Sequence, residues 1–173
     1  MYACVSLCVI VCVYIGFVPA AATTAAYLPC NVSREVDIHF MLDKVEKKFG
    51  TCDVFVGNAG VMGAIGGVEA MTDKDFKFAT EINVLQHIWA ARKLIPRWKA
   101  RPEGGAFVVV ASAAGLLTQI GSLAYAITKR SAGEYCSISF LDHRVTILYI
   151  IMAQIKCPCS WCCIKPCCHS LRG

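Results

Sequence analysis

A chain of 173 residues, 57% hydrophobic and 17% charged, is long enough for one domain with a sizeable core. Its net charge of +5 comes from 17 basic and 12 acidic side chains that form neither a basic block nor a stripe interleaved with aromatic residues. This pattern argues against a nucleic-acid partner. Of the twelve cysteines, only Cys30, Cys52 and Cys136 fall in the central part of the chain, too widely spaced to predict a disulfide framework.

The N-terminal segment, residues 3–22, is uncharged and mostly apolar, and a helix of this length spans a bilayer. Three interpretations stay open: a membrane anchor or uncleaved signal, a replaced N-terminus that says nothing of location, or, for part of it, a buried strand. We divide the chain into an apolar leader (1–26), a core (27–153) and a Cys-rich tail (154–173). Membrane association through residues 3–22 is one expectation.

The first half of the core alternates between extended and helical patterns. Residues 27–32 favour a short strand, and Ser33 is suited to cap a helix over 34–49, whose apolar residues recur at helical spacing until Gly50. Residues 53–56 predict a second strand, followed by a tight turn at 57–60.

The second half repeats this alternation. Thr72 and Asp75 approximate a capping box, and a long helix should follow until Pro96 and the break at 102–105. The apolar run 106–111 predicts a parallel strand buried on both faces, a helix should span 123–140, and 145–152 indicates another buried strand. This order predicts an α/β fold, a parallel sheet wound with helices on both sides.

Polar clusters around Asn31, Asn58 and Ser112 fall where predicted strands end. In doubly wound parallel sheets, ligands bind beyond the carboxyl ends of the strands. These three positions therefore predict the location of a binding site.

Tyr125 and Lys129 are four residues apart, so on a helix they share one face. A nearby ammonium favours the phenolate form of a tyrosine, which can then exchange a proton with an alcohol or carbonyl oxygen. Ser112 lies thirteen residues before Tyr125, across a glycine-containing loop that can return the chain to the same pocket. A serine hydroxyl there can hold the substrate oxygen.

These residues carry a resemblance to the short-chain dehydrogenase/reductase family. Tyr125-x-x-x-Lys129, with Ser112 in the run 111–115, is similar to the active-site signature of that family. Residues 53–60 (DVFVGNAG) resemble its Asp-x-x-x-Asn-Asn-Ala-Gly element, and residues 30–32 (CNV) resemble its Cys-Asp-Val turn. Asn83 matches the fourth member of its catalytic set, and the resemblance covers about residues 27–140.

The resemblance implies a hydride transfer between C4 of NAD or NADP and the carbonyl carbon of a small alcohol or carbonyl substrate. Tyr125 would exchange the proton, Ser112 would orient the carbonyl, Lys129 would assist Tyr125 and bind ribose hydroxyls, and Asn83 would hold a water. The cofactor-binding set implied in this way is Asn31, Val32, Asn58, Ala59, Gly60, Tyr125 and Lys129. Family members also form homo- or hetero-oligomers through the helices that bear Asn83 and Tyr125.

The chain departs from the family pattern in several places. No Gly-x-x-x-Gly-x-Gly turn precedes Tyr27, Asn31 stands for the usual Asp, Gly57 stands for the first Asn of Asn-Asn-Ala-Gly, and no Pro-Gly follows the strand at 145–152. We therefore expect a partial Rossmann-like sheet that lacks the N-terminal glycine-rich β-α-β unit. The alternative function is that of a non-catalytic, truncated member that pairs with a full-length relative.

The tail contains six cysteines between Cys157 and Cys168. Their spacings do not match the paired Cys-x-x-Cys knuckles of structural zinc sites, and no metal ligand is predicted. Zinc or copper binding, palmitoylation and an alternative C-terminus unconnected with the enzyme stay open for this segment.

Overall fold

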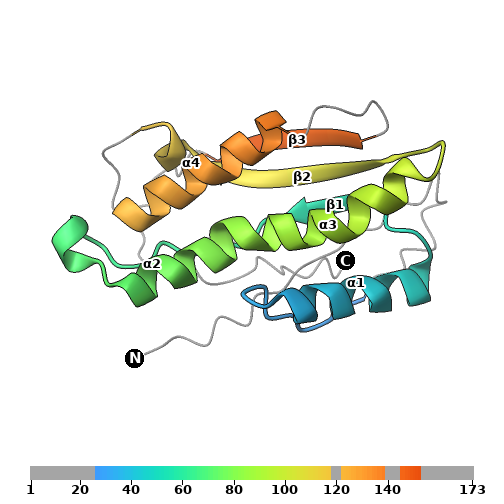
Figure 1. Cartoon of the computed structure of the whole chain (residues 1–173), viewed down its shortest axis with the longest axis horizontal. Helices are drawn as coiled ribbons and strands as arrows, with labels where there is room; N and C mark the ends of the chain where they lie inside the picture. Colours follow the sequence, from blue (N-terminus) through green and yellow to red (C-terminus); the bar gives the residue numbers. More distant parts are fainter. Residues whose placement is uncertain (1–25, 118–121, 139–144, 153–173) are drawn as a thin grey trace, which may run out of the picture.

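The computed structural model describes residues 26–117, 122–138 and 145–152 (Figure 1). The expectations for the apolar leader and the Cys-rich tail lie outside these residues. The elements in chain order are α1 (Glu35–Phe49), β1 (Val54–Gly57), the 3-10 turn η1 (Val68–Ala70), α2 (Asp73–Thr80), the π-helical turn η2 (Glu81–Leu85), α3 (Gln86–Lys99), β2 (Gly105–Ser112), the 3-10 turn η3 (Ala113–Gly115), α4 (Leu123–Ile138) and β3 (Val145–Met152).

The three strands form a parallel sheet in the order β1-β2-β3, which confirms the predicted α/β class. Figure 1 shows α1, α3 and α4 lying side by side against this sheet, with α3 between the other two. Alternate strand residues, among them Phe55, Phe107 and Ile147, are buried towards these helices. On the opposite face, Val56 and Leu148 are 37% and 49% exposed. In the described part of the chain, the helices thus cover one face of the sheet.

Trp98 anchors the end of α3 in the core. Its side chain is fully buried, its ring centroid lies 6.3 Å from that of Phe107, and its indole Nε1 donates a hydrogen bond to the Cys52 carbonyl at 2.6 Å. The helix α3 runs past Pro96 and ends at Lys99, before the break expected at 102–105. A proline removes one backbone N–H, and the burial of Trp98 two residues later holds the remaining residues helical.

Other boundaries differ by a few residues. The helix α1 begins at Glu35 with Arg34 as its N-cap, and the Ser33 side chain instead donates to Asn31 Oδ1 at 2.9 Å. Within the expected strand at 27–32 only an isolated bridge at Pro29 forms. The C-cap at Gly50 is confirmed, and so is the capping box of Thr72 and Asp75. No helix within the described ranges has the length and apolarity that crossing a bilayer requires.

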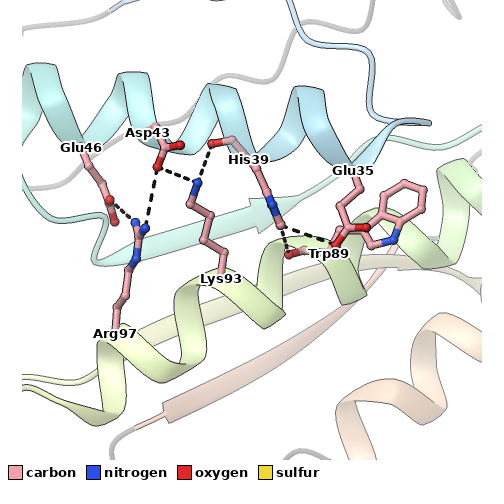
Figure 2. A network of polar contacts seen from close by, with 7 residues as sticks. All are labelled: Glu35, His39, Asp43, Glu46, Trp89, Lys93 and Arg97. Carbon is pink, nitrogen blue, oxygen red and sulfur yellow. Dashed lines mark hydrogen bonds and ion pairs between the residues drawn. The ribbon is translucent and has the colours of Figure 1, made fainter.

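The contact between α1 and α3 combines apolar packing with a row of polar interactions (Figure 2). Lys93, whose side chain is 13% exposed, donates to Asp43 Oδ1 at 2.6 Å and to the His39 carbonyl at 2.9 Å. Arg97 pairs with Glu46 and lies 3.7 Å from Asp43. Above all, the hydrogen bond from Lys93 holds the pKa of the Asp43 carboxyl below its usual value.

Replacing Lys93 with Met should lower the free energy of unfolding by about 1 kcal/mol at pH 7, because the His39 carbonyl and Asp43 lose a charged donor. The carboxyl pKa of Asp43 is lowered in the fold, so the stability from this pair is present above pH 4 and is lost as the pH falls further. Urea denaturation of both proteins at pH 7 and pH 3 measures the difference. If the free energies of unfolding of the two proteins differed equally at both pH values, the Lys93–Asp43 pair would not be the source of the difference.

Candidate active site

Ser112 is the last residue of β2 and caps the turn that follows. Its hydroxyl oxygen accepts a hydrogen bond from the Ala114 N–H at 3.2 Å, and the side chain is 3% exposed. The structure therefore places this serine at the carboxyl end of the central strand, as the sequence predicts.

The helix α4 carries Tyr125 and Lys129 on the same face, one turn apart. Its first turn is fixed by Ser122, whose hydroxyl oxygen accepts from the Tyr125 N–H at 3.4 Å. Lys129 Nζ lies 5.8 Å from the centroid of the Tyr125 ring and donates to the Val110 carbonyl of β2 at 2.9 Å. The ammonium therefore joins α4 to the strand that ends in Ser112.

Lys129 is almost completely buried, and burial lowers its pKa to about 8. Two glycines, which lack a side chain, leave space for Lys129. A Cβ on Gly60 would lie 3.1 Å from Lys129 Nζ, and a Cβ on Gly115 would lie 2.9 Å from the backbone carbon of Lys129. The turns that follow β1 and β2 can thus approach α4 closely.

Asn83 lies in the π-helical turn η2 and is fully buried. Its Oδ1 accepts from the Val61 N–H, and its Nδ2 donates to the Val61 carbonyl, both at 2.9 Å. Nδ2 also donates to Thr128 Oγ1 at 2.8 Å. Single π turns interrupt α-helices frequently at functional sites. Asn83 therefore connects the segment after β1 to the helix that bears Lys129.

The turn at Asn58–Gly60 follows β1 directly. Asn58 and Gly60 are exposed, whereas Ala59 is buried and its carbonyl accepts a hydrogen bond from Gln86 Nε2 at 2.7 Å. Because Gly60 lies against Lys129 and Asn83, four of the predicted site positions come together around Lys129.

Asn31 and Val32 precede α1 and contact different surroundings. Asn31 Oδ1 accepts from both the N–H and the hydroxyl of Ser33, at 3.1 and 2.9 Å. Val32 belongs to the same buried cluster as Ala59. In the described structure, Asn31 therefore contacts residues near it in sequence, and Val32 packs in the hydrophobic core.

Sequence reasoning missed Gln86, His87 and Thr128, which are all buried. His87 is 1% exposed, and in the described structure neither ring nitrogen has a hydrogen-bond partner. The Asn83 carbonyl lies close enough to favour the protonated ring, but burial, with the Lys129 charge second, lowers the pKa of His87 to about 3. The spacing of Asn83, Gln86 and His87 by three and four residues was the available signal.

A family model described as short chain dehydrogenase matches residues 17–146. The chain belongs to this family. Human estradiol 17-beta-dehydrogenase 11 is 33% identical over 129 residues, which cover 75% of this chain and 42% of that protein. The 3beta-hydroxysteroid dehydrogenase 2 of Eggerthella lenta is 30% identical over 99 residues, 57% of this chain and 38% of that protein.

The fold also matches solved structures of the family. A short chain dehydrogenase/reductase from Burkholderia phymatum, in complex with NAD, superimposes with a TM-score of 0.68 at 24% identity. The match covers 73% of this chain and 46% of that one. The chain spans 38–44% of the length of the curated relatives to which it is similar.

Among the described residues, those around Lys129 have the groups needed to bind the ribose part of a nicotinamide coenzyme. The exposed backbone at Asn58 and Gly60 beside Lys129 offers polar groups for a ribose. The Gly-x-x-x-Gly-x-Gly turn with which the family binds the pyrophosphate does not occur among the described residues. No cluster of potential metal ligands occurs in that same part of the chain.

Gly57→Ala should destabilise the fold by about 1–3 kcal/mol, because a Cβ there would lie 2.3 Å from His87 Nδ1 in a packed interior. In a His87→Ala background the same substitution should cost much less, since the ring is gone. Urea denaturation of the four proteins gives the coupling energy. Additive costs would show that the two residues do not compete for space.

Comparing wild type with Lys129→Met isolates the contribution of this lysine to the pH dependence of stability. The lysine pKa is about 8 in the fold against 10.5 in the unfolded chain, so burial of the charge destabilises the wild type at pH 7 and this penalty disappears between pH 8 and 10.5. Wild-type stability should therefore rise relative to the variant by up to about 1.4 kcal/mol per pH unit in this window.

Cys30 and Cys52, whose pKa values burial raises to about 11, lower stability above pH 9 in both proteins and cancel in the difference. Chemical denaturation at pH 7, 8, 9 and 10 measures that difference. A constant difference would mean that Lys129 has an ordinary pKa.

Proposed function

We propose that this chain is an NAD- or NADP-dependent oxidoreductase that interconverts an alcohol and a carbonyl compound. The observation that supports it best is the buried Lys129 ammonium, held 5.8 Å from the Tyr125 ring by the Val110 carbonyl. Relatives named as hydroxysteroid and estradiol dehydrogenases support a small-molecule substrate with a hydroxyl group on an apolar skeleton.

In this proposal the chain's own residues bind, orient and move a proton. Tyr125 exchanges a proton with the substrate oxygen, Lys129 stabilises the phenolate, and the Ser112 hydroxyl orients that oxygen. Asn83 would hold a water; both N–H groups of its side-chain amide are used by the Val61 carbonyl and Thr128 Oγ1, so a water there would bind by donating a hydrogen bond.

We assign coenzyme binding to the residues that the family resemblance implies. Asn58, Ala59 and Gly60 would present backbone groups to the coenzyme, Lys129 would bind its ribose hydroxyls, and Tyr125 would bind on the nicotinamide side. Asn31 and Val32 would contact the adenine. A bound nicotinamide supplies or accepts the hydride at C4.

A second function is the pairing of this chain with a full-length relative. It is favoured by the exposed apolar side chains on the sheet face opposite the helices, including Val56 and Leu148. Catalysis by an isolated monomer would contradict it.

Tyr125→Phe tests the catalytic proposal. Titration of purified wild type with NADH and NADPH should quench or shift the coenzyme fluorescence, and the variant should bind with a Kd within about threefold. Turnover of a hydroxysteroid should fall at least about 100-fold in the variant, because the proton donor is lost. Absence of coenzyme binding at millimolar concentration, with the fold intact by circular dichroism, would overturn the proposal.

A further inference from the structure

Gln86 is a buried amide directed at the backbone of the turn after β1. It is the first residue of α3, and its side chain is 2% exposed. Its Nε2 donates to the Ala59 carbonyl at 2.7 Å and also to the Ile82 carbonyl one helical turn earlier. Both N–H groups of the amide are therefore used, and one of them holds a peptide outside its own helix.

Asn83 holds the same segment from the preceding turn of the helical run. It bonds to both the N–H and the carbonyl of Val61. Gly60 lies between the two held residues, and a Cβ there would touch Lys129 Nζ at 3.1 Å. The two amides thus fix the backbone on either side of the glycine that faces the buried ammonium.

Few other contacts from α3 orient the turn at residues 57–60. Gly57 has no side chain, and the His87 ring occupies the space where a Cβ would lie. That ring makes no hydrogen bond in the described structure, so it fills volume without directing the peptide. The directional contact to residues 57–60 from this helix comes from Gln86.

We propose that Gln86 is a positioning residue of the coenzyme-binding turn. It fixes the Ala59 peptide and, through it, the positions of Asn58 and Gly60 relative to Lys129. The turn's role in coenzyme binding rests on the function proposed above, whereas the positioning itself is a property of the free protein.

The side chain can be changed in two informative ways. Gln86→Met keeps the length and most of the volume but has no donor, which leaves the buried Ala59 carbonyl unpaired. Gln86→Glu keeps a single donor, enough for the Ala59 carbonyl, and only while its carboxyl is protonated; burial favours that form. Once ionised, the carboxylate would face the Ala59 and Ile82 carbonyl oxygens and repel both.

Hydrogen exchange of the Val61 amide, whose N–H donates to Asn83 Oδ1, tests the positioning in the coenzyme-free protein. Protection factors should fall about tenfold in Gln86→Met. In Gln86→Glu they should be close to wild type at pH 5 and fall at pH 8. Arg92→Met, on the exposed side of the same helix, is the matched control and should leave them unchanged.

Wild-type protection in Gln86→Met, or a loss in Gln86→Glu that is equal at both pH values, would overturn the proposal and assign Gln86 to packing alone. If Gln86→Met does not fold, the pH dependence of Gln86→Glu decides. Titration with NADH should show a Kd raised about tenfold in Gln86→Met. If the wild type binds no coenzyme, the proposed function fails while the exchange data still decide the role of Gln86.

Discussion

The buried ammonium of Lys129 sets the arrangement around the site, because a charge removed from water needs polar partners in fixed places. The Val110 carbonyl supplies one such partner and ties α4 to β2. Gly60 and Gly115 let two strand-end turns approach the lysine, and Thr128 beside it bonds to Asn83. Tyr125 is held near the charge by its place on the same helix. The helices and the sheet thus meet at this cation.

A second constraint is that glycines on the strands face aromatic rings from α3. Gly57 faces the His87 ring, and Gly105 faces the Trp98 ring, where a Cβ would lie 2.2 Å from a ring atom. Each of these glycines lies on a strand, and each ring comes from α3. The helix can therefore lie closer to β1 and β2 than a sheet of larger residues would permit, which brings Gln86 within reach of the Ala59 carbonyl.

Much of this arrangement could be predicted from local patterns. The apolar run of β2, the capping box at Thr72 and the spacing of Tyr125 and Lys129 depend on neighbours in sequence, and the structure contains each of them. The continuation of α3 past Pro96 depends on the distant Cys52 carbonyl that Trp98 contacts. The roles of Gln86 and His87 likewise depend on Ala59 and Gly57, nearly thirty residues away. The local spacing of these residues from Asn83 indicates a shared helix face but not these contacts.

The contacts that organise Asn83, Ser112 and Lys129 lie within residues 57–129. Lys129 bonds to the Val110 carbonyl of β2, and Asn83 joins Val61, after β1, to Thr128 of α4. None of these bonds involves residues before β1. Asn31, by contrast, bonds locally to Ser33. The contacts around the residues proposed for proton transfer are therefore separate from those of Asn31, which is proposed to contact the distal part of a dinucleotide. The first depend on α4, η2 and β2, and the second on the segment that precedes α1.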